Sequence, residues 1–401
     1  MSAKVINFAN MKRIAVIFEG RLHEQKGVFN AVLNRVAHLR AIAPYDIDVH
    51  MIEGYDRGLN RWLHGTRRID ERPTLVTING IDIHVHWFCH SLLDTVRHKM
   101  LHRPAKVYRQ WLSRLADELK GYDLVSAHDR IAGTAAAMAC QRFGMPHFIT
   151  WHGASIYTDP PSDPVYRQTT IELLKHATCN FFVSHGLEQY ARQTLTDQFT
   201  SEVLYNGASA AFHRMDDATR INLRQQRGFA ASDWVIGFVG RMEPVKNVTL
   251  LPELFHSIAQ ASNQPLRFVA LGDGPQRDQV SRQMKERGIE CLMPGNVPRD
   301  EMPQWMNCMD VLVVPSRLEG FGLVAIEALQ CGANVVGTDA QGLPEVIGSE
   351  NAFALDDHLV ENMSRRAVEM LQGSVVQTVP PLMNWEATAQ REFEVYEAAT
   401  T

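Results

Sequence analysis

Cysteine is scarce in this sequence, and its six residues are scattered over 401 positions: Cys89, Cys140, Cys179, Cys291, Cys308 and Cys331. No two of them form a CxxC pair. Disulfide frameworks and structural zinc sites both depend on regularly or closely spaced cysteines. The spacing therefore argues against both, and it favours a protein that works in a reducing cytoplasm.

Long apolar runs and an excess of positive charge are also missing. No stretch approaches the roughly 20 apolar residues that cross a bilayer, and residues 1–11 lack a signal-peptide pattern. The formal net charge of −5 argues against bulk nucleic-acid binding. With 45% hydrophobic and 21% charged residues, the composition is typical of a soluble globular protein.

The length of 401 residues favours two domains, each with its own core. Short apolar runs alternate with helical patterns, which predicts two mainly parallel, doubly wound α/β sheets. The expected strands are residues 13–18, 47–52, 75–78, 81–86, 123–127, 147–150, 179–184 and 202–205, then 234–239, 266–271, 291–297, 311–314 and 334–338. Polar sequence without a strand pattern follows Asn206, so we expect domains at residues 1–208 and 209–384.

A glycine-rich turn, Glu319-Gly320-Phe321-Gly322, separates the strand at 311–314 from a helical pattern that contains Glu327. Open α/β sheets bind ligands at such turns. The glycines allow close approach of the backbone, and the free N–H groups of a helix start favour phosphate. Two carboxylates suit the neighbouring hydroxyls of a ribose or a sugar. A capping acid and a surface acid would explain the same pair equally well from the spacing alone.

Two cations, Arg241 and Lys246, follow the strand at 234–239, and we expect a helix to begin near Asn247. The planar arginine fork and the lysine point charge suit a diphosphate, which they would neutralise in the absence of a metal. Gly272-Asp273-Gly274 ends the next strand and would let a nucleotide approach the backbone closely. Because turns favour these residues anyway, that signal is weak.

Three turns at strand ends are candidate site segments in the first half. They are residues 19–27, which include Gly27, the pair His128-Asp129, and residues 150–154, which include His152. A strand-end histidine can bond a sugar hydroxyl or a phosphate, or hold a loop. With 17 histidines in the chain, a structural role is the default interpretation. His152 is the exception we favour, because Gly153 beside it suits a tight, ligand-facing turn.

Residues 95–116 contain no acidic residue and six basic ones: Arg97, Lys99, Arg103, Lys106, Arg109 and Arg114. Apolar residues are interspersed with them. The segment is typical of a basic amphipathic surface that contacts anionic lipid or a phosphate-bearing acceptor. A solvated helix face is the alternative interpretation.

The glutamate pair around Glu319-Gly-Phe-Gly resembles the signature of retaining glycosyltransferases of family 4, also called glycosyl transferases group 1. Gly240-Arg241 with Lys246, Gly272-x-Gly274 and Thr150-x-His152-Gly153 resemble further motifs of that family. The resemblance covers almost the whole chain; it is strong over 234–348 and thinner before 123. One departure is the first turn, where the family often has a Gly-Gly pair and this chain has Gly20 and Gly27 apart.

The resemblance implies the GT-B fold, in which two Rossmann-like domains face a central cleft and a terminal helix, here 385–401, packs on the first domain. It implies a hexosyltransferase-type enzyme (EC 2.4) without a metal or other cofactor. The enzyme would move a sugar from a UDP- or GDP-sugar to an acceptor hydroxyl, with front-face attack and the leaving phosphate taking the proton. Cell-surface polysaccharide, lipopolysaccharide or glycolipid synthesis is the expected pathway, with possible peripheral contact of 95–116 with the inner face of the membrane.

The resemblance also assigns roles to single residues. Arg241 and Lys246 would contact the diphosphate, Glu327 the ribose, Glu319 the donor sugar, and His152 the donor sugar or the acceptor. The expected catalytic set is Arg241, Lys246, Glu319 and His152. The expected donor site is Gly240, Arg241, Lys246, Gly272, Gly274, Asn296, Val297, Glu319, Gly320, Phe321, Gly322, Leu323 and Glu327. The expected acceptor side is Gly27, His128 and His152.

Three alternatives remain open at this point. A GT-B epimerase, hydrolase or phosphorylase would use the same donor motifs. A nucleotide-sugar binding protein without catalysis is disfavoured by the complete set of two cations and two acids. A dinucleotide dehydrogenase is poorly supported, because no GxGxxG follows the first strand.

Overall fold

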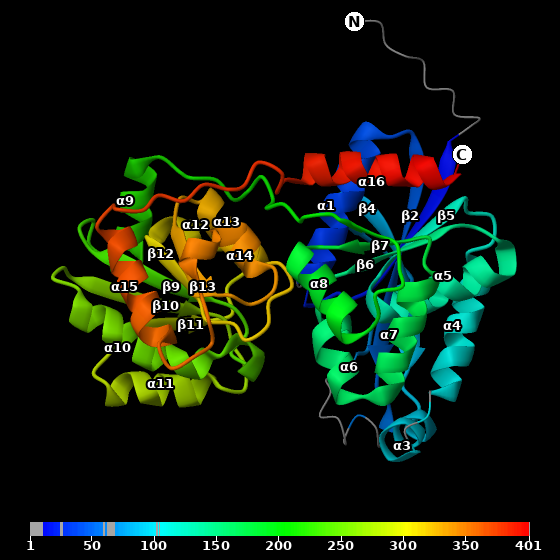
Figure 1. The fold of residues 1–401 in the computed structure, drawn as a ribbon, viewed down its shortest axis with the longest axis horizontal. Helices are drawn as coiled ribbons and strands as arrows, with labels where there is room; N and C mark the ends of the chain where they lie inside the picture. The colour runs from blue at the N-terminus through cyan, green and yellow to red at the C-terminus, as the bar shows by residue number, and fades with distance from the viewer. Residues whose placement is uncertain are drawn as a thin grey trace, which may run out of the picture. The chain divides into compact units, whose positions relative to one another are not determined.

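The computed structural model describes residues 11–24, 27–58, 61, 69–101, 103 and 105–400, and Figure 1 shows its fold. The chain divides into two compact units. Unit 1 comprises Met1–Val183, Leu187–Tyr205 and Trp385–Thr401, and unit 2 comprises Ser184–Gly186 and Asn206–Asn384. Within the described ranges, no helix is both long enough and apolar enough to cross a membrane.

Unit 1 is built on an eight-stranded sheet with the order β3-β4-β2-β1-β5-β6-β7-β8. Its strands are β1 (Lys12–Glu19), β2 (Tyr45–Tyr55), β3 (Leu75–Ile78), β4 (Ile81–Cys89), β5 (Leu124–His128), β6 (His147–Trp151), β7 (Cys179–Phe182) and β8 (Ser201–Val203). β3 pairs antiparallel with β4, and the other ladders are parallel. The carboxyl ends of the parallel strands therefore share one edge.

Helices cover both faces of this sheet: α1 (Gly27–Ile42), α3 (Leu92–Leu101), α4 (Lys106–Glu118), α5 (Asp129–Phe143), α6 (Asp159–Ser162), α7 (Pro164–His176), α8 (His185–Thr194) and α16 (Trp385–Thr400). Alternate side chains of a strand point to opposite faces. Val16 of β1 packs in one core with α1 and the terminal helix α16. Ile17 packs in the other core with α4 and α5. This division is what makes the sheet doubly wound.

Unit 2 has a six-stranded, fully parallel sheet with the order β11-β10-β9-β12-β13-β14. Its strands are β9 (Trp234–Val239), β10 (Leu266–Leu271), β11 (Cys291–Gly295), β12 (Val311–Val314), β13 (Asn334–Thr338) and β14 (Ala352–Phe353). The chain winds outward from β9 in one direction and from β12 in the other. Ligand crevices of such sheets lie beyond the strand ends at this reversal point.

The helices of unit 2 are α9 (Asp217–Gln226), α10 (Leu251–Ala261), α11 (Arg277–Glu286), α12 (Met302–Cys308), α13 (Leu323–Gln330), α14 (Leu343–Ile347) and α15 (Leu359–Leu371). The helix expected near Asn247 begins there as a 3₁₀ turn, Val248–Leu250, which runs directly into α10; the α-helix itself starts only at Leu251. Asn247 has a left-handed φ of 53° and lies between two 3₁₀ turns. A residue in this conformation cannot lie inside a right-handed α-helix.

Candidate functional site

The loops that follow β9 and β12 meet at the reversal point of the unit 2 sheet. These two strands are neighbours in the sheet, so their carboxyl ends lie side by side. The backbone N–H of Arg317 donates a hydrogen bond of 2.8 Å to the carbonyl oxygen of Val245. This bond holds the turn that carries Glu319 against the loop that carries Lys246.

Lys246 and Glu319 form an ion pair, with 2.6 Å between Lys246 Nζ and Glu319 Oε2. The side chains are 27% and 13% exposed, so water reaches both charges only in part. Gln341 fixes the turn, because its Oε1 accepts a 3.0 Å hydrogen bond from the Glu319 backbone N–H. Two residues 73 positions apart, each predicted from its own motif, are therefore brought together.

Glu327 has a partner that the sequence did not indicate. Both of its carboxylate oxygens accept hydrogen bonds from the guanidinium of Arg299, one of them at 3.1 Å. The same guanidinium lies over the ring of Phe212, 4.6 Å from its centroid. Burial raises the pKa of Glu327, and the Arg299 charge opposes that shift. Arg299 thus holds the second predicted acid in place.

Arg241 is held less firmly than Lys246. Its side chain is 56% exposed, and its ion pair is with Glu243 of its own loop, at 3.3 Å. A weakly held, exposed arginine can turn toward an incoming anion at little cost. The structure therefore joins Lys246 to Glu319 but gives Arg241 a separate, local partner.

The glycines after β10 have a structural reason of their own. Gly272 has a φ of +123°, and a Cβ there would lie 2.1 Å from the carbonyl oxygen of Gly240. A Cβ on Gly274 would lie 2.5 Å from the carbonyl oxygen of Met242. The loops after β9 and β10 thus pack backbone against backbone, which accounts for both glycines. Their contact with a nucleotide stays a prediction.

Other residues predicted for the donor site lie in two separate parts of unit 2. Gly322, with a φ of +100°, is the cap of α13, and Phe321 before it is buried. Asn296 and Val297 follow β11, which β10 separates from β9 in the sheet. The described contacts do not join Asn296 or Val297 to the Lys246–Glu319 pair.

In unit 1 the structure pairs the two predicted histidines. His128, at the end of β5, lies with its Nδ1 2.9 Å from Nε2 of His152, and their rings stack at 5.2 Å. Burial lowers the pKa of His152 to about 3, helped by the positive charge of Arg35. Burial also lowers the pKa of His128 well below its usual range. Both imidazoles are therefore neutral at pH 7, and one donates a hydrogen bond to the other. Gly27 is the first residue of α1, and the two residues before it lie outside the described ranges.

Asp129 completes this cluster, although the predicted site omitted it. Its carboxylate accepts a 3.2 Å hydrogen bond from the His152 backbone N–H, and its own backbone has a left-handed φ of 62°. Burial raises the pKa of Asp129 to about 7; the His152 N–H opposes the shift, and the charges of Asp159 and Glu19 add to it. The turn His128-Asp129 was the available sequence signal.

We expect Asp129→Asn to stabilise unit 1 above pH 7. The folded pKa of about 7 exceeds the ordinary value of 3.8, so the protonated carboxyl stabilises the fold at low pH and that stability is lost as pH rises through 7. The variant should exceed the wild type in unfolding free energy by more than about 1 kcal/mol at pH 8 and should converge with it near pH 4. Urea titrations across this pH range measure the difference. The same substitution at exposed Asp217 is the control, and a difference that does not change with pH would contradict the assignment.

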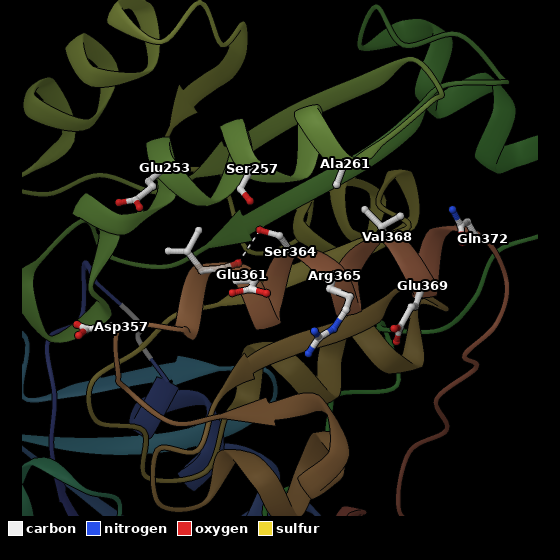
Figure 2. A pocket seen from close by; sticks show the side chains of 11 residues that line it. Glu253, Ser257, Ala261, Asp357, Glu361, Ser364, Arg365, Val368, Glu369 and Gln372 are labelled. Atoms are coloured by element: carbon white, nitrogen blue, oxygen red, sulfur yellow. Dashed lines mark hydrogen bonds between the residues drawn. The ribbon is translucent and has the colours of Figure 1, made fainter.

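The groove in Figure 2 lies elsewhere in unit 2, between α10 and α15. It has a volume of about 580 Å³. Its lining residues are Glu253, Ser257, Ala261, Asp357, Val360, Glu361, Ser364, Arg365, Val368, Glu369 and Gln372. None of them belongs to the predicted site, so the groove does not mark it. Among the described residues, no group of three or more His, Cys, Asp or Glu side chains could hold a metal ion.

Comparisons with known proteins show the family and the fold. Residues 219–387 match the family model for glycosyl transferases group 1, and residues 30–207 match that for the glycosyl transferase 4-like domain. The chain is 26% identical over 227 residues to the putative teichuronic acid biosynthesis glycosyltransferase TuaC of Bacillus subtilis (56% of this chain, 55% of that protein). It is 27% identical over 256 residues to a D-inositol 3-phosphate glycosyltransferase of Jonesia denitrificans (59% and 60%). The matched part thus spans little more than half of these two relatives.

The Anabaena protein HepE, solved in complex with UDP-glucose, has a similar structure. The TM-score is 0.65 at 20% identity, with 96% of this chain and 97% of that one covered. This likeness shows the GT-B fold. The family follows from the two family models, which cover most of both halves: the chain belongs to the glycosyl transferases of group 1, family-4-like nucleotide-sugar glycosyltransferases that act with retention.

Proposed function

We propose that this glycosyltransferase moves a hexose from a UDP- or GDP-sugar to an acceptor hydroxyl in the synthesis of a cell-surface polysaccharide, a lipopolysaccharide or a glycolipid. The contact between Lys246 and Glu319 at the reversal point of the unit 2 sheet carries the proposal. An ammonium and a carboxylate at that point are the two groups that a diphosphate-linked sugar needs: a cation for the phosphate and an acceptor for sugar hydroxyls.

The donor would enter by exchanging partners with this pair. A diphosphate brings negative charge, so it would compete with Glu319 for Lys246. Arg241 would turn from Glu243 toward the diphosphate and neutralise part of its charge. The released Glu319 carboxylate would then accept hydrogen bonds from the sugar. Glu327, held by Arg299, would bond the ribose hydroxyls. The two cations would stabilise the diphosphate as it departs.

Unit 1 would bind the acceptor at its strand ends. A neutral histidine offers one donor and one acceptor of hydrogen bonds, which suits a hydroxyl better than a phosphate. His152, partly exposed and backed by His128, is the residue we assign to that contact. Gly27 would let the acceptor or the donor phosphate approach the start of α1.

The relatives support the pathway and the donor class. TuaC is named for teichuronic acid biosynthesis, and HepE was solved with UDP-glucose. We also propose a cytoplasmic location, with peripheral contact at the inner face of the membrane. UDP-sugars are the first donors to test.

Thermal stabilisation by a panel of UDP- and GDP-sugars tests the proposal. A donor present at 100 times its Kd should stabilise the protein by about 2.7 kcal/mol. We expect one donor to raise the Tm of the wild type and of a Lys285→Ala control, an exposed lysine on α11, but not that of Lys246→Ala. No shift with any donor would overturn the proposal. Rapid consumption of the donor without an acceptor would indicate a hydrolase instead.

A further inference from the structure

The helices α3 and α4 form a hairpin with an unusual outer surface, here called the basic–apolar surface. Its exposed members are Leu92, Leu93 and Val96 on α3, Arg103 before α4, and Lys106 and Arg109 at the start of α4. Leu93 is 76% exposed. Among the described residues, no ion pair involves these three cations. Apolar and cationic side chains are thus presented together to solvent.

The one acid in residues 91–116 does not offset this charge. Asp94 is buried, and its carboxylate accepts hydrogen bonds from the backbone N–H groups of Lys106 (2.8 Å), Val107 (3.1 Å) and Tyr108 (2.7 Å). It therefore caps α4, where its charge meets the positive end of the helix. The surface outside keeps its positive charge, although the whole chain carries −5.

The hairpin is anchored to unit 1 from the inside. Leu112 and Leu115 of α4 are buried in the core beneath the sheet. Phe88, in β4, packs its ring against Tyr108 and Trp111, with centroids 4.3 Å and 5.4 Å away. The inner face of α4 is thus used for packing, and the exposed leucines of α3 are not part of that core.

The position of the hairpin relates it to the acceptor side. β4 ends at Cys89 and α3 begins at Leu92, so the hairpin follows the carboxyl end of a strand that is parallel to β2, β1, β5 and β6. That edge also carries the His128–His152 pair. Figure 1 shows α3 at one tip of this unit.

We propose that the basic–apolar surface docks on an anionic lipid bilayer and that the acceptor is linked to a lipid of that bilayer. The leucines would enter the interface between headgroups and acyl chains, while the cations would contact anionic headgroups. A helix face that meets only solvent gains nothing from two adjacent exposed leucines. An acidic protein partner would account for the cations but not for the leucines, whereas a bilayer interface accounts for both. The acceptor part of this inference rests on the proposed function; the docking does not.

Sedimentation of the full chain with vesicles tests the docking. We expect binding to phosphatidylcholine vesicles that contain phosphatidylglycerol, little binding to phosphatidylcholine alone, and weaker binding as salt rises. Arg103→Glu combined with Lys106→Glu should lower the partition coefficient at least about tenfold, and Leu93→Ser should lower it several-fold. The matched controls in unit 2 are Leu382→Ser, a leucine 68% exposed, and Lys285→Glu.

The outcomes separate this inference from the proposed function. Equal binding of the charge-reversal variant and the wild type, or equal binding to both vesicle types, would overturn the docking, provided that circular dichroism shows a folded variant. Stabilisation by the nucleotide sugar should be unchanged in the hairpin variants. A wild type that binds the donor but not the anionic vesicles would refute only the present inference. Vesicle binding without any donor binding would refute the proposed function and leave the docking intact.

Discussion

Lys246→Ala should lower kcat by about 10²–10³-fold while leaving the fold intact. Removing one group that stabilises transition-state charge costs roughly 2.7–4 kcal/mol in the barrier. The Lys246–Glu319 pair is partly exposed, so its loss should cost only about 1 kcal/mol of stability. The two numbers differ enough to separate a functional role from a structural one.

Steady-state kinetics with the donor found by thermal shift, together with urea unfolding, measure both quantities. Lys285→Ala is the control for loss of a lysine charge. Glu319→Gln should abolish transfer yet leave the affinity for the nucleoside diphosphate unchanged or tighter, because Lys246 then has no competing carboxylate. Full activity of Lys246→Ala, or a stability loss large enough to explain its inactivity, would contradict the assignment.

The meeting of Lys246 and Glu319 was predictable because each residue follows a buried parallel strand. Runs such as Val311–Val314 can be recognised as buried parallel strands from their composition. The loops that follow neighbouring parallel strands lie at the same edge of the sheet. The local motifs therefore implied a tertiary contact. The sequence also placed His128 and His152 in the turns at two strand ends; the structure makes those strands neighbours and stacks the two rings.

The Glu327–Arg299 pair could not be predicted in the same way. Arg299 lies in a turn after β11 without a recognisable pattern, and it reaches Glu327 only through the fold of unit 2. The α-helix α10 starts later than Asn247 because the backbone of Asn247 is left-handed, a conformation that its residue type permits but does not require. Asp129 was visible in the sequence, but its raised pKa depends first on its burial in the folded unit and then on the charges of Asp159 and Glu19, which come from other segments.

Glu392→Ala in the terminal helix should destabilise unit 1 by about 3–5 kcal/mol, the largest stability effect we expect. Glu392 and Arg35 of α1 are 1% and 2% exposed, with Arg35 Nε 3.0 Å from Glu392 Oε2. Arg35 also donates to Thr150 Oγ1 at 3.1 Å, two residues before His152. Removing the carboxylate leaves the guanidinium charge buried without a counter-charge, which accounts for that cost.

The terminal helix supplies its own control for this effect. Arg391, the neighbouring residue, forms an exposed ion pair with Glu202 at 2.7 Å, so Arg391→Ala should cost at most about 1 kcal/mol. The double variant Arg35→Met/Glu392→Leu should recover much of the lost stability, because two apolar side chains replace two buried charges. Urea unfolding of Arg35→Met, Glu392→Leu and the double variant measures this coupling. Additive single and double effects would mean that the two buried groups act independently, and the ion pair would then not be what fastens α16 to α1.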